Sequence, residues 1–176
     1  MKVEKTTLDG VLVVTPEIYE DFRGANMSIY NEGEYVRAGI DIKFVEDKVT
    51  TSWRNVLRGI HGDPGTWKFV ACLYGEIHFV VVNCDESDPA AFGKWEAFRL
   101  SRSNRRQVLV PPIYGNAHLV MSEFAVFHYK WSEYYHPEAQ FSYRFDDPRF
   151  KIPWPTAGPY LSERDALPWD AIGRKH

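Results

Sequence analysis

Short strand-like segments recur along this chain, and they constrain its fold more than any other feature. Each segment is rich in β-branched and aromatic residues, which favour extended structure, and turn-forming residues separate it from the next. Long amphipathic helical patterns are scarce, so we expect an all-β fold, either an antiparallel sandwich or a barrel. Eight or more strands fit a double-sheet jelly roll. The segments cover residues 10–14, 43–51, 56–61, 68–84, 95–100, 107–111 and 118–131.

The domain organisation follows from length and from a change in composition near the end. The chain has 176 residues, which suits one domain spanning residues 1–176. Gly75 lies inside the long apolar stretch 68–84 and predicts a hairpin turn there. After Asp146 the chain becomes Pro-rich, which excludes a central strand. We expect this tail to wrap the barrel and to end in a short helix near Ser162.

Charge and apolar patterning limit the partners. The 21 Lys and Arg nearly balance the 24 Asp and Glu, so general attraction to nucleic acid or an anionic membrane is not expected. Apolar runs of signal-peptide or bilayer length are not found, and a cytoplasmic protein is the expectation. The two cysteines, Cys72 and Cys84, lie in strand-like segments and are expected to be buried thiols.

Three side chains suggest proton-transfer chemistry. His61 ends an apolar run, Tyr129 lies in another, and Asp165 stands near the end of the chain. A base oriented by a carboxylate and opposed by a phenol suits proton abstraction next to a ketone. Each residue also has a structural interpretation. His61 could be a satisfied core histidine, Tyr129 could fill the core beside Phe127, and Asp165 could belong to a helix cap that starts at Ser162.

A collinear set of short motifs resembles the dTDP-4-dehydrorhamnose 3,5-epimerase family over nearly the whole chain. The motifs are Asp21-Phe22-Arg23-Gly24, Leu57-Arg58-Gly59-Ile60-His61, Lys68-Phe69-Val70, Gly75-Glu76, Val110-Pro111, Ser122-Glu123, Tyr129-Lys130, Asp146-Asp147-Pro148, Trp154-Pro155 and Leu161-Ser162-Glu163-Arg164-Asp165.

The resemblance implies a cofactor-independent isomerase with the jelly-roll fold. Such an enzyme is a homodimer, needs no metal, and inverts carbons flanking the C4 ketone of a nucleotide-linked sugar. By resemblance, His61 is the base, Asp165 orients it, Tyr129 is the acid on the opposite face, and Lys68 stabilises the developing O4 charge. The alternative for Lys68, next to Trp67, is a solvated strand end.

The diphosphate candidates are Arg23 and Arg58, because guanidinium groups match phosphate oxygens. The alternative is surface charge. The resemblance implies that Arg23 reaches the ligand from the partner subunit. Strict strand alternation would place Arg58 and His61 on opposite faces, and a bulge at Gly59 would bring them together.

Departures from the family pattern bear on the substrate. Thymidine-specific members differ at Glu46 and Lys48, and the family's Ala-His-Gly histidine aligns with Asn116. The variant pattern resembles the branch that acts on GDP-linked 4-keto-heptoses in bacterial capsule synthesis. The predicted substrate is therefore a GDP-4-keto-6-deoxy-heptose or a related GDP-4-keto-heptose. The expected substrate and nucleotide contacts are Arg23, Arg58, Glu46, Lys48, Asp63, His78, Asn116, His118 and Tyr134. For Asp63, His78 and His118, the alternative is a polar network lining the barrel.

Other functions remain open from sequence. One is a C3-only epimerase that acts on a dTDP-4-keto-6-deoxyhexose. Another is a metal-dependent cupin using His61, His78 and His118, although their spacing is poor for that purpose. A third is a non-catalytic sugar-nucleotide binding module. The sequence leaves open whether C3 alone or both C3 and C5 are inverted, and also the product stereochemistry and the final glycan.

Overall fold

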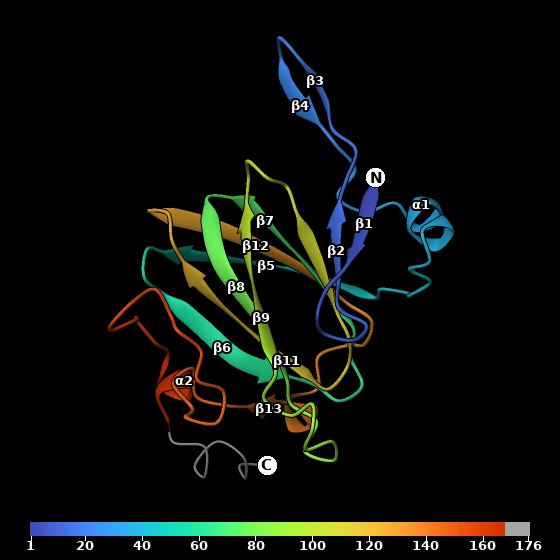
Figure 1. The fold of residues 1–176 in the computed structure, drawn as a ribbon. Helices are drawn as coiled ribbons and strands as arrows, with labels where there is room; N and C mark the ends of the chain where they lie inside the picture. The colour runs from blue at the N-terminus through green and yellow to red at the C-terminus, as the bar shows by residue number, and fades with distance from the viewer. Residues whose placement is uncertain (168–176) are drawn as a thin grey trace.

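Two antiparallel sheets lie face to face in the computed structural model, which describes residues 1–167 (Figure 1). The six-stranded sheet has the order β1-β2-β10-β7-β12-β5 and the five-stranded sheet the order β13-β6-β11-β8-β9. The strands of the first are β1 (Lys2–Lys5), β2 (Leu12–Thr15), β10 (Gln107–Val110), β7 (Lys68–Tyr74), β12 (Phe124–Trp131) and β5 (Glu46–Trp53). Those of the second are β13 (Phe141–Ser142), β6 (Leu57–Gly62), β11 (Tyr114–Val120), β8 (Glu76–Asn83) and β9 (Trp95–Ser101).

Alternating apolar residues from both sheets form the core between them. Val70 and Phe127 come from one sheet, and Phe79, Val81 and Leu100 come from the other. The rings of Phe79 and Phe127 meet across the gap with their centroids 6.0 Å apart. In a strand, every second side chain points to the same face. The alternation of apolar residues in these segments therefore predicted strands with one face in the core.

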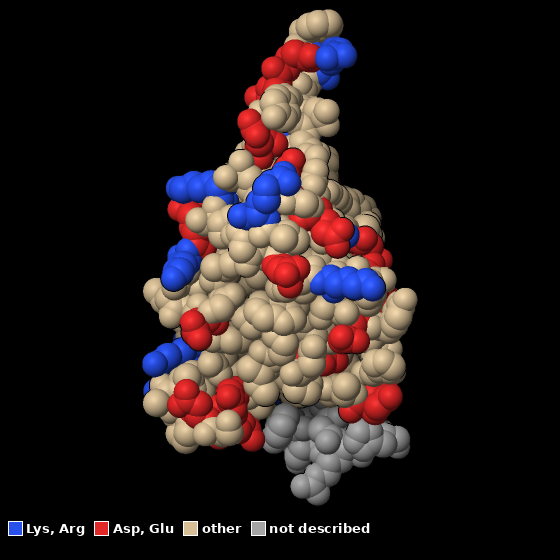
Figure 2. All heavy atoms as spheres, turned by 90° about the vertical axis from the view of Figure 1, so that its right-hand side faces the viewer, with Lys and Arg blue, Asp and Glu red and all other residues tan. Residues whose placement is uncertain are grey.

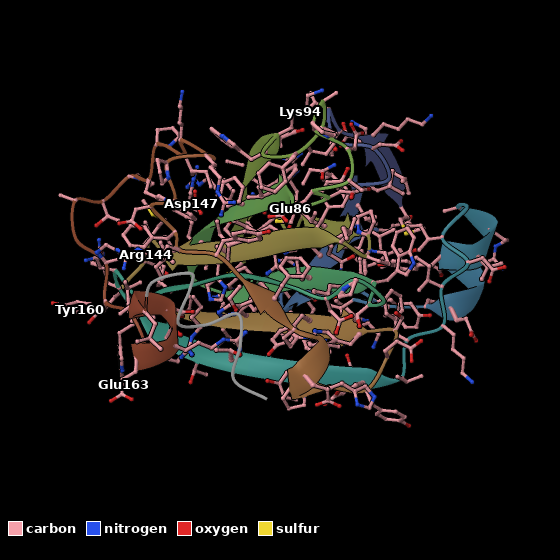
Figure 3. The ribbon with its side chains drawn as sticks, turned by 90° about the horizontal axis from the view of Figure 1, so that it is seen from below. Glu86, Lys94, Arg144, Asp147, Tyr160 and Glu163 are labelled. Atoms are coloured by element: carbon pink, nitrogen blue, oxygen red, sulfur yellow. The ribbon has the colours of Figure 1, made fainter. Side chains whose placement is uncertain are left out.

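Three short helices complete the described residues: α1 (Glu32–Arg37), the 3₁₀ helix η1 (Pro137–Ala139) and α2 (Glu163–Ala166). The Ser162 hydroxyl accepts a hydrogen bond from the backbone N–H of Asp165 and caps α2. The Pro-rich tail before α2 runs beside β6, where the backbone N–H of Leu57 donates to the carbonyl of Tyr160 at 3.0 Å. Figure 3 shows α2 at the side of the sheets, with Glu163 pointing away from them.

The predicted jelly roll, with few helices and a tail ending in a short helix, is confirmed. The segment 68–84 divides at Gly75 into β7 and β8, as the turn signal predicted, and Gly75 has a φ of +76°. The segment 118–131, read as one strand, is wrong as a single element because β11 and β12 divide it at residues 121–123. Cys72 and Cys84 are buried free thiols, as predicted.

A hairpin stands away from the two main sheets. It consists of β3 (Tyr19–Asp21) and β4 (Gly24–Asn26), and all its residues are exposed. Phe22, in its turn, is 97% exposed. Figures 1 and 2 show the hairpin projecting from one end of the molecule, with acidic and basic side chains along it. No described helix has the length and apolar character needed to cross a bilayer.

Candidate active site

A cavity of about 390 Å³ lies between the two sheets and is closed on one side by the tail helix α2. Most of its lining is polar or aromatic. The contributing elements are β5, β6, β7, β11, β12 and α2, so both sheets and the tail meet at this point. The lining residues are Lys48, Thr50, Arg58, His61, Lys68, Val70, Asn116, His118, Phe127, Tyr129, Trp131, Tyr135, Gln140, Ser162, Arg164 and Asp165.

His61 on β6 is joined to Asp165 on α2. Nε2 of His61 lies 2.5 Å from Oδ1 of Asp165, whose side chain is almost fully buried. Burial raises the pKa of Asp165, but the hydrogen bond and charge of His61 outweigh it and hold that pKa below its ordinary value. The two interpretations of Asp165 are compatible, because its backbone N–H is capped by Ser162 while its carboxylate orients His61. His61 is not enclosed in the core, since it lines the cavity.

Tyr129 faces the same cavity from the other sheet. It lies on β12 between Phe127 and Trp131, at ring-centroid distances of 5.2 and 6.0 Å. Its side chain is half-buried and packs against the core while lining the cavity. A phenol and an imidazole therefore approach one space from opposite sheets.

Lys68 is buried at the start of β7 and only 4% exposed, so its interpretation as a solvated strand end is wrong. Its Nζ donates to the carbonyl of His61 at 3.2 Å and to Oδ1 of Asn116 at 3.1 Å. Burial lowers the pKa of Lys68 to about 8, although the nearby charge of Asp63 favours the protonated form. Lys68 thus remains mainly cationic at pH 7, with its ammonium bonded to these two acceptors.

Arg58 and His61 both line the cavity because β6 carries an extra residue relative to β11. His61 pairs with Asn116 and Arg58 with His118, so the register shifts between them, as a bulge at Gly59 predicted. Gly59 has a φ of +111°, and a Cβ there would lie 2.5 Å from the carbonyl oxygen of Asn116. Only glycine fits this close approach. The Arg58 side chain is held by a 3.0 Å hydrogen bond from Nε to the Ser52 hydroxyl.

Asn116 and His118 lie on one face of β11 and both line the cavity, as alternation predicts. His118 is 4% exposed, and its ring stacks on Phe127 with centroids 4.4 Å apart. Burial, together with the charges of Arg58 and His61, lowers the pKa of His118 to about 3, although the charge of Asp165 opposes the shift. His118 is therefore neutral across the physiological range.

The cavity rim holds a lysine between two aromatic rings. The Nζ of Lys48 lies 4.3 Å from the Trp131 ring centre and 4.4 Å from that of Tyr135. Glu46 accepts a hydrogen bond from the backbone N–H of Tyr135, and Lys48 lies 3.1 Å from the Glu46 carboxylate. Tyr134, the tyrosine singled out from sequence, is 65% exposed and outside the cavity lining. Tyr135 takes the place at the cavity instead.

Besides Tyr134, four predicted contact residues are absent from the cavity lining. Glu46 contacts the lining residues Lys48 and Tyr135 but does not line the cavity itself, and Asp63, His78 and Arg23 lie elsewhere. Asp63 accepts hydrogen bonds from the Gln140 amide at 2.6 Å and from the Gly65 N–H at 2.8 Å. His78 faces the other side of its sheet, because its neighbours on β8 point into the core, and it contacts the Trp154 ring at 5.7 Å. Arg23 lies on the β3–β4 hairpin, where it pairs with Asp21.

Two alternatives from sequence depended on these positions. A polar network joining Asp63, His78 and His118 is not formed, since His78 lies on the opposite face of the five-stranded sheet. For the same reason, His61, His78 and His118 do not converge as metal ligands. Within residues 1–167 no three His, Cys, Asp or Glu side chains gather in a way that could hold a metal ion.

Several cavity residues were missed by sequence reasoning. Trp131 lies two residues after Tyr129, so strand alternation could have identified it. Ser162 and Arg164 belong to the same motif as Asp165, but only their place on α2 brings them to the cavity. Thr50 lies two residues after Lys48, so the same alternation could have identified it, whereas Gln140 carries no distinguishing signal in the sequence.

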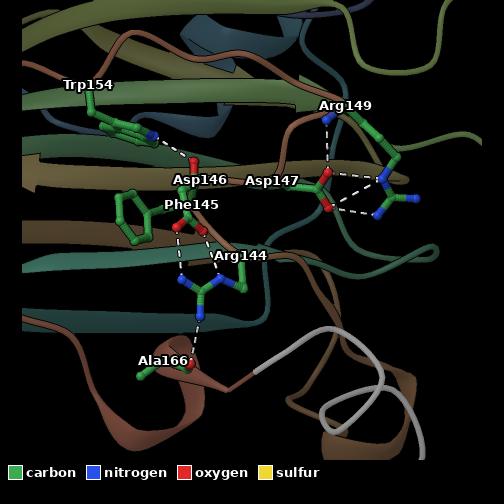
Figure 4. Close-up of polar contacts among 7 residues, drawn as sticks. All are labelled: Arg144, Phe145, Asp146, Asp147, Arg149, Trp154 and Ala166. Atoms are coloured by element: carbon green, nitrogen blue, oxygen red, sulfur yellow. Dashed lines mark hydrogen bonds and ion pairs between the residues drawn. The ribbon is translucent and has the colours of Figure 1, made fainter.

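The segment 142–146, which begins at the last residue of β13, contacts the His61–Asp165 pair from both sides. Ser142 pairs with His61 in the sheet and accepts a 2.6 Å hydrogen bond from the Arg164 guanidinium. Arg144 forms a two-point ion pair with Asp146, and its remaining nitrogen, Nη1, donates to the carbonyl of Ala166 at 2.8 Å (Figure 4). One segment therefore contacts both the strand that carries the imidazole and the helix that carries its carboxylate.

Comparison with known proteins gives consistent matches. The family model described as dTDP-4-dehydrorhamnose 3,5-epimerase matches residues 5–169. Enzymes of that name from Methanothermobacter thermautotrophicus and Escherichia coli are 37% and 35% identical to this chain, covering 86% and 94% of it and 82% and 91% of themselves.

Solved structures agree with these matches. A Legionella pneumophila dTDP-6-deoxy-D-glucose-3,5-epimerase in complex with dTDP-4-keto-L-rhamnose superposes with a TM-score of 0.88 at 35% identity, covering 94% of this chain and 89% of its own. A 3'-monoepimerase from Streptomyces bikiniensis in complex with dTDP-quinovose gives 0.86 at 30% identity, with coverages of 95% and 87%.

Proposed function

The chain belongs to the dTDP-4-dehydrorhamnose 3,5-epimerase family, and from this membership we propose that it inverts C3 and also C5 of a nucleotide-linked 4-keto sugar. It is an isomerase of nucleotide sugars. The observation that carries the proposal is the cavity in which His61, oriented by Asp165, and Tyr129 approach from opposite sheets. Inversion at carbon needs a base on one face and an acid on the other.

The proposed mechanism begins with removal of a proton next to the C4 ketone. That proton is acidic because the resulting anion delocalises onto O4. His61 takes it, and the buried Asp165 stabilises the imidazolium that forms. General acid–base catalysis contributes about 10²–10⁴ in rate, so stabilising the enolate oxygen must supply much of the remainder.

Lys68 is assigned to stabilising the enolate as the proton leaves, and Tyr129 to returning a proton in the second half of the reaction. The ammonium of Lys68 stands beside Asn116 in the cavity wall, where it would neutralise charge developing on O4. Tyr129 would then donate its proton to the face opposite His61 and leave the carbon inverted. Arg58 is assigned to the diphosphate. The proposal requires no metal or organic cofactor.

For the nucleotide, we favour a guanine base because of Lys48, which lines the cavity, and Glu46, which pairs with it. A lysine can donate to O6 of guanine or to O4 of thymine. A carboxylate can accept from both N1–H and the N2 amino group of guanine, whereas the O2 of thymine would face its second oxygen. The substrate we propose is a GDP-4-keto-6-deoxy-heptose or a related GDP-4-keto-heptose, used for bacterial capsule or surface polysaccharide.

A second candidate is a C3-only epimerase acting on a dTDP-4-keto-6-deoxyhexose. The dTDP part is supported by the names of the relatives, which refer to dTDP sugars, and the C3-only part by the monoepimerase among the solved structures. Direct competition between GDP and dTDP for the protein, measured by calorimetry, separates the two. Tighter binding of dTDP, unchanged in Glu46→Gln, would favour the second candidate.

We also propose a homodimer in which Arg23 completes the partner's site. β5 is the edge strand of the six-stranded sheet, and its Val49 and Trp53 side chains are exposed. A projecting hairpin that carries Arg23 is suited to reach along such an edge. Sedimentation should give a dimer, and mixing inactive Arg23→Ala with inactive His61→Asn should restore activity. A monomer with full activity would contradict this arrangement.

The decisive experiment is proton exchange in D₂O. GDP- and dTDP-linked 4-keto sugars are incubated with the protein, and the C3 and C5 hydrogens are followed by NMR. We expect deuterium at C3 and also at C5, with both lost in His61→Asn. Exchange at the wild-type rate in His61→Asn would overturn the assignment of the base.

A further inference from the structure

Among residues 1–167, two buried side-chain nitrogen or oxygen atoms lack a hydrogen-bond partner. They are Nε2 of His118 and Nε1 of Trp131. Folded proteins pair at least about 90% of their buried polar groups, and an unpaired one costs stability. Both residues line the same cavity. Two unpaired groups in the wall of one cavity point to a ligand that pairs them.

Trp131 specifies what that ligand must offer on its side of the cavity. The indole N–H can only donate, and the residue is 6% exposed. The charged groups that flank its ring are donors as well, with the Nζ of Lys48 at 4.3 Å and that of Lys68 at 5.6 Å from the ring centre. An indole N–H whose ring lies beside two ammonium groups needs an acceptor, and an anionic oxygen is the acceptor that these charges favour.

His118 specifies a different group. Its ring is fixed against Phe127 and stays neutral, so it offers one donor and one acceptor nitrogen. His118 pairs with Arg58 across the β6–β11 ladder, and it lies close enough to His61 for the charge of His61 to lower its pKa. The unpaired Nε2 donates in one tautomer and accepts in the other, and a hydroxyl can pair with it in either case.

We propose that the bound sugar nucleotide completes both residues, an oxygen of the ligand accepting from the Trp131 indole and a sugar hydroxyl pairing with His118. This inference rests on the proposed function and narrows the substrate to a sugar that carries a hydroxyl next to the catalytic base. A site built for a hydroxyl discriminates against the deoxy analogue, because the analogue leaves the protein group unpaired.

The inference has a consequence that a structural role would not have. Replacing an unpaired polar group by an apolar one of similar shape removes a cost in the free protein, so thermal stability should hold or rise. Ligand binding should weaken in the same variants. A residue that merely supports the fold would lose stability and leave binding unchanged.

The test uses His118→Phe, His118→Met, and site-specific insertion of benzothienylalanine, which keeps the indole shape without the N–H, at position 131. The matched control is the same insertion at Trp154, whose indole already donates to the carbonyl of Phe145 at 2.7 Å. The Tm without ligand, the ligand-induced rise in Tm, and kcat and KM are measured with the sugar nucleotide that the wild type turns over.

We expect the variants at 118 and 131 to keep or raise the ligand-free Tm and to raise KM roughly five- to tenfold. The control at 154 should lower the Tm and leave KM unchanged. Variants at 118 and 131 that behave like this control would overturn the inference while the wild type still epimerises. If the wild type neither turns over nor is stabilised by any of the sugar nucleotides, the proposed function itself fails.

Discussion

Among residues 1–167, two strand histidines pair with an aspartate, and the surroundings of the two pairs differ. His61 and Asp165 meet in the cavity, and the Asp165 side chain is only 4% exposed. His128 and Asp47 meet at 2.8 Å on the opposite face of the six-stranded sheet, and the Asp47 side chain is 57% exposed. Position 128 alternates with 127 and 129, so this second imidazole points away from the cavity.

The carboxylate of the second pair is already shared. Lys130 donates to both oxygens of Asp47, at 2.8 and 2.7 Å. Burial raises the pKa of Asp47, but Lys130 and then His128 outweigh it and hold the pKa low. In the first pair, the His61 imidazole is the main partner that holds the Asp165 pKa low. A histidine–aspartate contact becomes a candidate base only where a cavity opens in front and an opposed acid faces it.

The most direct test of whether the two pairs differ in function is to replace each histidine by asparagine. His61→Asn should reduce deuterium uptake at C3 by about 10²–10⁴, because it removes the proposed base. His128→Asn should stay within about twofold of wild type. Equal losses in the two variants, measured by NMR in D₂O at matched protein concentration, would mean that the pairs are functionally alike.

Removing the phenol separates proton removal from inversion. Tyr129→Phe should slow product formation about 100-fold, since it deletes the proposed acid. Washout at C3 should fall by less than about tenfold, because His61 and Asp165 remain. Both rates come from one NMR time course, and a parallel loss of washout and inversion would contradict separate roles.

Removing the Arg144 contact that supports the His61–Asp165 pair should have a smaller effect on kcat. Arg144→Gln breaks the link to the carbonyl of Ala166 and should lower kcat about tenfold through Asp165, with KM within about twofold. The matched control is Arg149→Gln, since Arg149 pairs with the neighbouring Asp147 (Figure 4).

The pH profile of kcat distinguishes this effect from general loss of structure. Arg144→Gln should displace the acidic limb, because Asp165 would no longer be held against His61. Arg144→Lys should recover part of the rate. An unchanged profile with a uniformly lower rate would indicate loss of folded protein only.

The smallest expected effect is on stability at alkaline pH. The pKa of Lys68 is about 8 in the folded protein and about 10.5 when unfolded, so the unfolded chain binds more protons between these values. Wild type should therefore gain stability relative to Lys68→Met as pH rises from 8 towards 10.5. Its epimerisation rate should fall over the same range as the ammonium is lost. Urea melts and initial rates at matched pH measure the two trends.

Local patterns predicted most of the strands because alternation and turn residues are local. The division of 118–131 was missed because its turn contains neither Gly nor Pro. That turn is stabilised across the fold, where the Ser122 hydroxyl accepts from the backbone N–H of Glu76. The short elements β1, β3, β4, β13 and α1 were missed for a related reason, since each has too few residues for a periodic signal.

For the site, residues anchored in strand register were predictable and those placed by long-range packing were not. The cavity positions of His61, Arg58 and His118 followed from alternation plus one bulge at Gly59. The exclusion of His78 was also readable, since its apolar neighbours Ile77 and Phe79 define the core face. Gln140, by contrast, is placed by its hydrogen bond to Asp63, a contact between residues far apart in the sequence that local patterns do not predict.

The contact between Gly59 and β11 carries a consequence for how such a scaffold can diverge. A side chain at 59 would collide with Ala117, so these two positions are locked together as a small pair. Positions 116 and 118 flank Ala117 on β11, and their side chains point into the cavity rather than towards Gly59. Laboratory evolution towards new sugars should therefore accumulate exchanges at 116 and 118 and spare 59 and 117, a pattern of mutable and immutable neighbours that alternates along one strand.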